Sequence, residues 1–536
     1  MTPRKLSVGQ IHGRSCCFKW YSKGMYIWLA VWVCVAVAEA LLYTFLGWRA
    51  LRVPSVRLAI SGAVLLAVLG AEAMMAVHYW EWWWAALLLA PYRLFNLARV
   101  FVYRLQRDHL SSVCLRAFFW LACTQLVAAG VLWAIRDVPL VWVLGVVASV
   151  QFAVALLLLR ASVATWEYAR PLTPLHHYTD AALPSLSVLV PARDESQALQ
   201  TCLESLIRSD YPKLEILVLD DCSQNRHTPD IIRGFARDGV RFVRGQEPPR
   251  DWVAKNYGYE QLRQEASGEV LLFCGVDTSV ETTTLRALME TLLSREKDML
   301  SVLPARPLST PTLSLLQSMR YYWELCLPRR MFKRPPVLST CWMIRARALD
   351  DFGGFGAFAQ SVSPEAACAR LAVVRDAYTF IRSYGAARVY SLKTPAEQYE
   401  NTVRVRYPQL HRRLELVAAA AAGELLFFVG PFVGMPGSLF LPHSAAFFAV
   451  WAASALTVEV LYYLIAVQTR LQSAWVAFLA APVAFALDVV MLHVSLFQYE
   501  FGTVNWKGRN VCVPVMRLAS PRASGNLQEE GSSRYR

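Results

Sequence analysis

The sequence predicts an α/β domain with a mostly parallel sheet, inserted between two blocks of transmembrane helices. The 536-residue chain is 55% hydrophobic, with a mean hydropathy of +0.32. Its apolar residues form long runs before about residue 165 and after about residue 415. Between these runs, charged residues and turns separate short apolar segments, as in a soluble domain. This middle stretch is long enough to bury a core of its own.

The composition divides the chain into four parts. Residues 1–164 are expected to form an N-terminal transmembrane region with four or five spans, and residues 165–410 a cytosolic α/β domain. Residues 411–500 are expected to form two or three further spans, followed by a basic, disordered tail at residues 501–536.

Four N-terminal segments have the length and hydropathy of membrane spans, since a hydrocarbon core of about 30 Å needs about 20 apolar residues in a helix. They cover residues 25–48, 58–78, 117–135 and 140–159. Residues 80–103 are ambiguous, because they carry Pro91 and the polar residues Arg93, Asn96 and Arg99. This stretch either spans the membrane or lies in its interface.

Three C-terminal segments are also apolar enough to be spans. They cover residues 416–433, 445–467 and 475–497. The first is interrupted by Pro431 and followed by Pro436, which is compatible with a re-entrant segment.

Basic residues in both tails predict that both tails are cytosolic. They are Arg4, Lys5, Arg14, Lys19 and Lys23 at the N-terminus and Lys507, Arg509, Arg517, Arg522, Arg534 and Arg536 at the C-terminus. With a cytosolic central domain, this requires an even number of spans on each side, and four before plus two after satisfy it. Five plus three would place both tails outside, although it would place Arg49, Arg52 and Arg57 inside, as the rule favours. We favour the even count.

The charge and cysteine content narrow the class of protein further. We expect a multi-pass protein of the plasma membrane, whose net charge of +14 faces anionic lipid and an anionic substrate, with no nucleic-acid partner. The twelve cysteines and nine histidines show neither a CxxC pair nor a ligand spacing, so no disulfide framework or zinc site is expected. Cys16 and Cys17 are either acylated or free thiols, and we favour free thiols.

The central domain alternates strands and helices. Strands are expected at residues 185–190, 214–219, 240–243 and 270–273, and helices at residues 197–208, 228–239 with Thr228 as its cap, 255–266 and from about 282. This order predicts a mostly parallel sheet with ligands at the carboxyl ends of its strands.

Acidic residues follow three of these strands. They are Asp194 and Glu195, then Asp220 and Asp221, and finally Asp277. A single Asp after a strand is usually a turn or helix cap. Three sets in register instead suit a nucleotide and a divalent cation, because one carboxylate accepts from the base or ribose and another holds Mg²⁺ or Mn²⁺ against a diphosphate.

Six short motifs follow one another between residues 184 and 410. They are VPARDE at 190–195, the Asp220-Asp221 pair, DWVAKN at 251–256, GEVLLF at 268–273 leading to Asp277, GGF at 353–355 and RVYS at 388–391. Their order and spacing resemble the family 2 inverting glycosyltransferases, whose motifs are VPARNE, DD, GWxGKN, DxD, GGH and RMYxS. The closest resemblance is to the membrane-bound branch that glycosylates carotenoids, hopanoid-like lipids and other lipid acceptors.

This resemblance implies a GT-A-like fold that binds a nucleotide sugar, with UDP-hexose favoured, and roles for eight residues. The nucleotide sugar would be bound by Pro191, Asp194, Glu195, Asp220, Asp221 and Lys255, with Lys255 at the diphosphate. Asp277 would hold the divalent cation, Mg²⁺ or Mn²⁺. Glu365 would be the catalytic base that accepts the acceptor's proton.

The chain departs from the family pattern at three places. The first carboxylate of DxD is replaced by Gly275, so Asp277 would bind the cation together with diphosphate oxygens and water. The family's ED pair falls on Pro364-Glu365, which makes the base a Glu in place of Asp. The QxxRW signature of processive synthases is absent at residues 401–407, which favours transfer of a single sugar over polymerisation.

Residues 312–334 combine apolar side chains at helical spacing with the basic cluster Arg329, Arg330, Lys333 and Arg334. This pattern is typical of an interfacial helix that holds the active site at the lipid surface, or of a core helix with a solvated end. The neighbouring spans favour the interfacial helix.

Three classes of function remain compatible with the sequence. The first is an enzyme that transfers a hexose from a nucleotide sugar to a membrane lipid or lipid-linked acceptor. The second is a polysaccharide synthase that exports its product, which the missing QxxRW disfavours. The third is an inactive glycosyltransferase-like scaffold, with which the altered DxD and ED motifs are compatible.

Overall fold

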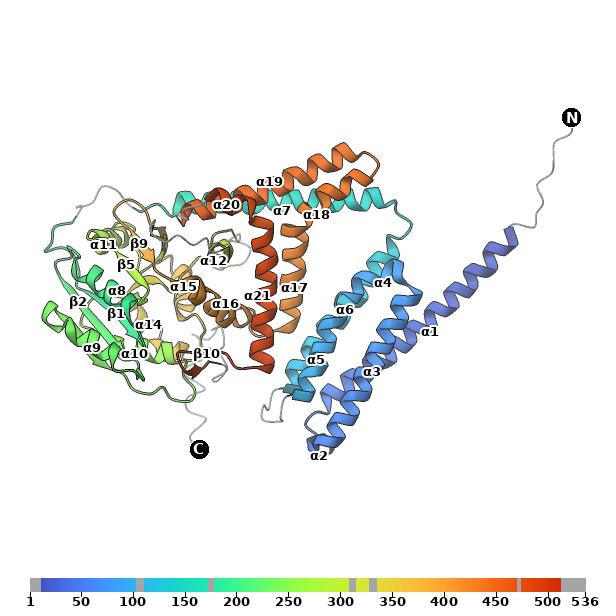
Figure 1. Cartoon of the computed structure of the whole chain (residues 1–536), viewed down its shortest axis with the longest axis horizontal. Helices are drawn as coiled ribbons and strands as arrows, with labels where there is room; N and C mark the ends of the chain where they lie inside the picture. The colour runs from blue at the N-terminus through green and yellow to red at the C-terminus, as the bar shows by residue number, and fades with distance from the viewer. Residues whose placement is uncertain are drawn as a thin grey trace. The chain divides into compact units, whose positions relative to one another are not determined.

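The computed structural model describes residues 11–102, 110–171, 178–307, 315–326, 335–469 and 474–511, and Figure 1 shows its helices and strands. The chain forms two compact units, Met1–Val146 with Arg413–Ala422, and Val147–Arg412 with Gly423–Arg536. The side chains of Cys16 and Cys17, the basic cluster at 329–334 and most basic residues of the tails lie outside what is described. The nine cysteines with described side chains are free thiols.

The first unit consists of helices. They are α1 Ile11–Thr44, α2 Arg49–Arg52, α3 Pro54–His78, α4 Trp80–Leu87, α5 Ala90–Val102 and α6 Leu110–Ala134, and α7 Leu140–Tyr168 begins in it. The ambiguous stretch at 80–103 forms the two short helices α4 and α5. Its Arg93 is buried and pairs with Glu39 at 2.5 Å and Glu72 at 2.9 Å. Because each helix is too short to span a bilayer and its charge is paired inside the unit, this stretch is not a fifth span.

Seven helices of the described residues are long and apolar enough to cross a membrane. They are Tyr26–Thr44, Pro54–His78, Leu110–Ala134, Leu140–Tyr168, Leu414–Phe440, Ser444–Gln468 and Ala481–Phe501. These candidates suggest a multi-pass membrane protein. Four precede the α/β domain and three follow it, and the side of the membrane on which the domain lies stays a prediction.

The second unit is built on a seven-stranded sheet with strand order β3-β2-β1-β4-β7-β6-β8. The strands are β1 Leu186–Ala192, β2 Leu214–Asp220, β3 Val240–Arg244, β4 Val270–Cys274, β6 Met299–Leu303, β7 Cys341–Arg345 and β8 Tyr378–Arg382. All neighbours are parallel except β7, which runs antiparallel to β4 and β6. The predicted mostly parallel, GT-A-like sheet is confirmed, and all four predicted strands are present.

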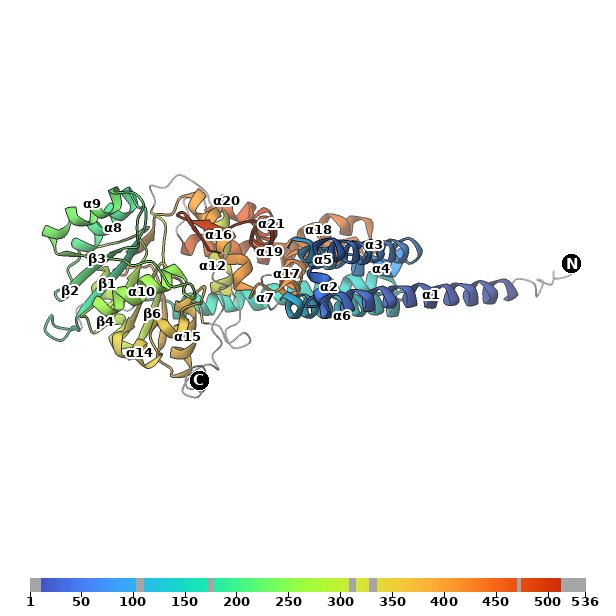
Figure 2. The same ribbon diagram turned by 90° about the horizontal axis from the view of Figure 1, so that it is seen from below.

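Helices cover this sheet on both faces (Figures 1 and 2). They include α8 Gln197–Ile207, α9 His227–Gly234, α10 Ala254–Glu265, α11 Thr284–Ser294, α14 Ala346–Asp351 and α15 Pro364–Val374. The prediction that Thr228 caps α9 is wrong, because the cap is Arg226. The Thr228 hydroxyl accepts instead from the Glu195 backbone N–H at 2.7 Å. That contact anchors the loop after β1.

Two small antiparallel sheets lie outside the large one. The first pairs β5 Thr278–Val280 with β9 Val389–Ser391, so that Thr278 faces Ser391. The second is a hairpin after the last helix, β10 Asn505–Trp506 with β11 Arg509–Asn510. Both sheets bring residues far apart in sequence to the ends of β1 and β4.

The C-terminal helices follow the α/β domain in the sequence. They are α17 Leu414–Glu424, the π-turn Leu425–Val429, α18 Gly430–Gly437, α19 Ser444–Gln468, α20 Ala474–Leu479 and α21 Ala481–Phe501. The π-turn lies just before Pro431, which lacks a backbone N–H, and the Leu426 carbonyl accepts from Gln151 at 2.6 Å. Helix α21 packs beside α16 Pro395–Gln409 of the domain (Figures 1 and 2).

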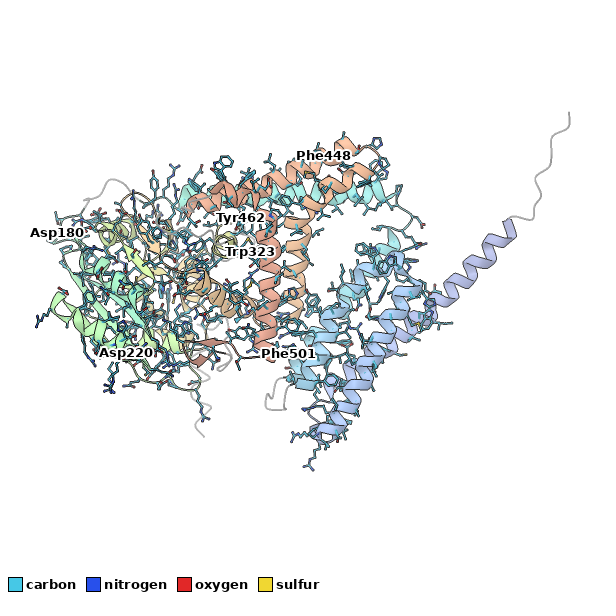
Figure 3. The ribbon with its side chains drawn as sticks, in the orientation of Figure 1. Asp180, Asp220, Trp323, Phe448, Tyr462 and Phe501 are labelled. Carbon is cyan, nitrogen blue, oxygen red and sulfur yellow. The ribbon has the colours of Figure 1, made fainter. Side chains whose placement is uncertain are left out.

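Helix α12 Leu315–Cys326 packs against these C-terminal helices. Its Tyr322 ring meets Phe428 and Phe485 at 5.4 and 5.2 Å. Figure 3 shows the neighbouring Trp323 close to α21, where its indole N–H donates to Asp488 at 3.1 Å. Within the predicted helix of residues 312–334, the described part α12 therefore packs against two of the candidate spans, and the rest lies outside the described residues.

Candidate active site

A cavity of about 500 Å³ lies at the carboxyl ends of β1 and β4. Its walls come from the loops after these strands, the first turns of α10 and α15, one face each of α12 and α16, and the hairpin β10–β11. Ligands of parallel α/β sheets bind at this edge, because the loops there are free to diverge from the sheet. The cavity is therefore the candidate active site.

Five of the eight predicted site residues line this cavity. They are Pro191, Glu195, Lys255, Asp277 and Glu365. The other three, Asp194, Asp220 and Asp221, are not among its lining residues. Most of the side chains that were predicted from their positions after strands or at helix starts therefore lie in one cavity. They come from four separate loops or helix starts.

Two of the three remaining carboxylates stabilise loops. Asp194 accepts from the backbone N–H groups of Gln224 and Asn225 at 2.8 and 3.1 Å. Asp220, labelled in Figure 3, accepts from the Ser223 N–H at 3.1 Å. Both contacts are those of an Asp that caps a turn, which is the ordinary role of an Asp after a strand.

The hairpin after the last helix supplies the partners of Glu195 and Asp221. Lys507 forms an ion pair with Glu195, and Arg509 pairs with Asp221 at 2.6 Å. Burial raises the pKa of Glu195 and of Asp221, although Lys507 and Arg509 act in the opposite direction. The carboxylates predicted to meet the nucleoside are thus both engaged by residues more than 280 positions away in the sequence.

Asp277 is positioned by the pairing of β5 with β9. It directly precedes β5, and its carbonyl accepts from the Leu392 N–H at 2.7 Å. The next residue, Lys393, therefore lies beside it, and its Nζ is 3.0 Å from Asp277 Oδ2. Burial raises the pKa of the Asp277 carboxyl, but Lys393, the Asp277 backbone N–H and Arg320 together hold that pKa below its usual value.

Taken alone, the described residues around Asp277 do not supply a full set of ligands for a cation. In the described part of the chain, no three His, Cys, Asp or Glu side chains come together as metal ligands. A Cβ built on Gly275 would lie 2.7 Å from Asp277 Oδ1, so Asp277 itself fills the space beside that glycine. The single carboxylate at this position is paired with a lysine, whereas Mg²⁺ and Mn²⁺ require several oxygen ligands.

Lys255 and Glu365 face each other across the cavity floor. Lys255 Nζ, in the first turn of α10, is 3.6 Å from Glu365 Oε2, in the first turn of α15. Asn256 fixes this arrangement, because its side-chain amide donates to the carbonyls of Phe358 and Ser361 at 2.8 Å each. Glu365 is buried, and its Oε2 accepts no hydrogen bond from the described residues. A buried carboxylate with a free oxygen at a cavity wall is suited to accept a proton.

Besides Lys507 and Arg509 of the hairpin, sequence reasoning missed three further basic side chains in the cavity. They are Arg320 of α12, Lys393 after β9 and Arg404 of α16. Burial lowers the pKa of Arg404 to about 10. Burial also lowers the pKa of Lys255; Glu365 opposes this effect, and Arg404, Arg320 and Lys393 add to it. These side chains are close enough to affect one another's charge, and no local motif marks them in the sequence.

Comparisons with known proteins agree on the class of domain. Residues 187–353 match the family model described as Glycosyl transferase family 2. Glycosyltransferase AglE of Haloferax volcanii is 35% identical over 103 residues, which are 18% of this chain and 32% of that protein. The GalNAc(5)-diNAcBac-PP-undecaprenol beta-1,3-glucosyltransferase of Campylobacter jejuni is 30% identical over 111 residues, which are 20% of this chain and 34% of that protein. The chain spans about a third of the length of these curated relatives.

Two of the solved structures similar to the chain are a mannosyltransferase and a glucosyl-3-phosphoglycerate synthase. The mannosyltransferase PcManGT from Pyrobaculum calidifontis, solved with GDP-Man and Mn²⁺, aligns with a TM-score of 0.40 and 16% identity, covering 63% of this chain and 97% of that one. Glucosyl-3-phosphoglycerate synthase from Mycobacterium tuberculosis, solved with UDP and Mn²⁺, aligns with a TM-score of 0.30 and 16% identity, covering 46% and 88%.

Proposed function

We propose that this chain, which carries a family 2 glycosyltransferase domain at residues 187–353, transfers a sugar from a nucleotide sugar to a lipid or lipid-linked acceptor with inversion. The observation that supports it best is the single cavity that unites Lys255, Asp277 and Glu365 at the carboxyl ends of the strands. The runs of candidate spans on both sides of the domain favour an acceptor in the membrane.

The donor occupies the part of the cavity next to the carboxyl ends of β1 and β4. Pro191 and Glu195 lie at its rim and contact the nucleoside. Asp221 joins them when the nucleoside replaces Arg509 as its hydrogen-bond partner, and Asp194 and Asp220 hold the surrounding loops in place. Lys255 reaches the diphosphate from the first turn of α10, where the helix dipole also favours an anion. UDP-hexose is the favoured donor, as the resemblance to the family implies.

Inversion requires a base on the acceptor side and a stabilised leaving group on the donor side. Glu365 accepts the proton of the acceptor hydroxyl, whose oxygen forms the new bond to the anomeric carbon. The bond from that carbon to the phosphate oxygen breaks, and the nucleoside diphosphate leaves with both electrons. Lys255 lies between Glu365 and the donor, so it can stabilise the ionised carboxylate before reaction and the diphosphate after it.

Helix α12 connects this chemistry to the candidate spans. Arg320 and Glu324 on one of its faces line the cavity, whereas Tyr322 and Trp323 pack on the C-terminal helices. An acceptor that enters along α12 keeps its apolar part among these helices and presents its hydroxyl to Glu365. The Campylobacter jejuni relative is named for a polyprenol-linked acceptor, which agrees with this class, and a carotenoid- or hopanoid-type lipid is another member of it. The domain faces the cytosol at the plasma membrane.

The test is transfer by the full-length protein in membranes supplied with radiolabelled UDP- and GDP-sugars. We expect label in the lipid extract for one donor, in a product of one added sugar. Label in a long water-soluble polymer would indicate a polysaccharide synthase. Tight nucleotide binding without transfer from any donor would indicate an inactive scaffold.

A further inference from the structure

We propose that basic side chains, with Lys393 at their centre, neutralise the donor diphosphate in this protein without a divalent cation. Arg320, Arg404 and Lys255 complete the set. The inference rests on the proposed function, because it specifies how the same cavity binds its nucleotide sugar.

The pairing of β5 with β9 places a lysine where a cation would sit. Asp277 ends the loop after β4, and the register of the small sheet brings Lys393 Nζ to 3.0 Å from its carboxylate. Gly275 supplies no second carboxylate, and the space beside it is filled by Asp277. A lysine ammonium paired with one aspartate retains N–H donors for a phosphate oxygen. It therefore supplies the positive charge at this place.

Basic side chains from three other elements line the same cavity, beside the carboxylates Glu324 of α12 and Glu397 and Glu400 of α16. Lys255 comes from α10, Arg320 from α12 and Arg404 from α16. In the described structure, the hydrogen bonds of the two arginines go to neutral oxygens, with Arg320 donating to Ser339 Oγ and Arg404 to Asn401 Oδ1. Their like charges lower the pKa of Lys255, in addition to the larger effect of burial. A diphosphate among them would relieve this repulsion.

The helix starts add the positive ends of two helix dipoles to the basic side chains. The first turns of α10 and α15 both line the cavity, at Val253 and Ala254 and at Ser363 and Ala366. Helices of 12 and 11 residues carry partial positive charge at their first turns. The neutralising groups are therefore present before any ion binds.

Binding of UDP and GDP to the full-length protein in detergent, measured by calorimetry, tests the inference without requiring transfer. We expect one of the two nucleotides to bind with the same Kd, within about twofold, in EDTA and in Mn²⁺. Binding that requires Mn²⁺ and disappears in EDTA would overturn the inference and leave the proposed function standing. Failure of both nucleotides to bind in any condition would reject the inference together with the proposed donor.

The variant Lys393→Ala tests whether Lys393 supplies the positive charge that binds the diphosphate. We expect it to weaken nucleotide binding in EDTA about tenfold or more, since it removes charge-assisted hydrogen bonds to phosphate. The matched control is Lys297→Ala, because Lys297 pairs with Asp376 at the same distance of 3.0 Å and does not line the cavity. The control should bind as the wild type does. Unchanged binding by Lys393→Ala in EDTA would overturn the role of Lys393.

The double variant Gly275→Asp with Lys393→Ala gives a second readout. It removes the lysine and provides two carboxylates around the vacated position. We expect its nucleotide binding to be weak in EDTA and to be restored at least in part by Mn²⁺, which the wild type does not need. Equal binding by the double variant in EDTA and in Mn²⁺, at wild-type affinity, would contradict the inference. Retention of the wild-type melting temperature shows that any loss is not a failure to fold.

Discussion

At the scale of single residues, Glu365 decides whether the cavity is catalytic. Its carboxylate is buried, its Oε2 accepts no hydrogen bond from described residues, and its one cationic neighbour is Lys255. If it is the base, Glu365→Gln removes proton acceptance and keeps the shape of the side chain. We expect the rate of transfer to fall at least about a hundredfold while the donor Kd changes little. Single-turnover kinetics with saturating donor measure this loss.

Glu365→Asp is the companion variant, because it restores the residue that the family motif carries. Pro364 fixes the start of α15, so the shorter carboxylate is withdrawn from the cavity by about an ångström. We expect measurable activity from Asp and none above background from Gln. Equal transfer by wild type and Glu365→Gln would remove Glu365 as base and direct the search to Glu195.

The ionisation of Asp277, in the same cavity, contributes to the stability of the fold. Its folded-state pKa lies below the usual value, which is about 3.9 in an unfolded chain. The ionised form therefore stabilises the fold above that pH, and this contribution is lost as the pH falls through about 4 toward the folded-state pKa. We expect the melting temperature of the wild type to fall more steeply between about pH 5 and pH 3 than that of Asp277→Asn. Parallel curves for the two proteins would show that the Lys393 pair does not stabilise the fold.

At the scale of elements, the hairpin β10–β11 competes with the nucleoside. Arg509 holds Asp221 at 2.6 Å, so a nucleoside that binds Asp221 has to displace it. We expect Arg509→Ala to tighten UDP or GDP binding several-fold, since charge-assisted hydrogen bonds of this kind contribute about 1.5–3 kcal/mol. Arg233→Ala is the control, because Arg233 pairs with Asp230 on the surface. Weaker binding by Arg509→Ala would mean that Arg509 contacts the nucleotide directly.

The elements that the sequence predicted are those with local signals. Apolar β-branched runs marked β1 to β4, and the carboxylates after them located the cavity, because parallel strands place their carboxyl ends at one edge. Strands β6 to β8 were not predicted, and neither was the reversal of β7, since long-range pairing is not encoded in any short segment. Lys393 was not predicted beside Asp277, because it lies 116 positions further along and reaches Asp277 only through the β5–β9 register. The cation-binding role of Asp277 stays a prediction. The pairing of Glu195 and Asp221 with the hairpin was not predicted for the same reason, because the partners are far apart in the sequence.

At the scale of the whole molecule, the C-terminal helices leave the α/β domain and return to it. Arg412, just before α17, lies 3.6 Å from Glu500, near the end of α21, and the Tyr407 hydroxyl donates to the same Glu500 at 2.7 Å. A path that starts and ends at one place crosses a membrane an even number of times. We therefore expect one of the three candidate spans after the domain not to cross, and the π-turn before Pro431 makes Leu414–Phe440 the best candidate.

This path predicts on which side the hairpin lies. A cysteine introduced at the exposed Asn505 is expected to react with a membrane-impermeant maleimide from the same side as a cysteine at the exposed Asp230 of α9. Labelling is read as the increase over the wild type, which has its own thiols. A reporter fused before Met1 should also lie on that side if all four N-terminal candidates cross. Reaction of the Asn505 and Asp230 positions from opposite sides would contradict an even number of C-terminal crossings.

The pairing of Glu195 and Asp221 with Lys507 and Arg509 also has a consequence for biosynthesis. The ribosome delivers the sheet long before it delivers the hairpin, because α17 to α21 are synthesised in between. Until then, the two largely buried carboxylates lack their ion-pair partners Lys507 and Arg509, which is costly for a folded domain. The nascent domain thus reaches its full stability only after the last helix has been inserted and has carried the hairpin back to the sheet. Chains truncated before Asn505 would lack Lys507 and Arg509, so both carboxylates would stay unpaired. We expect cellular proteases to degrade such chains faster than the full-length protein.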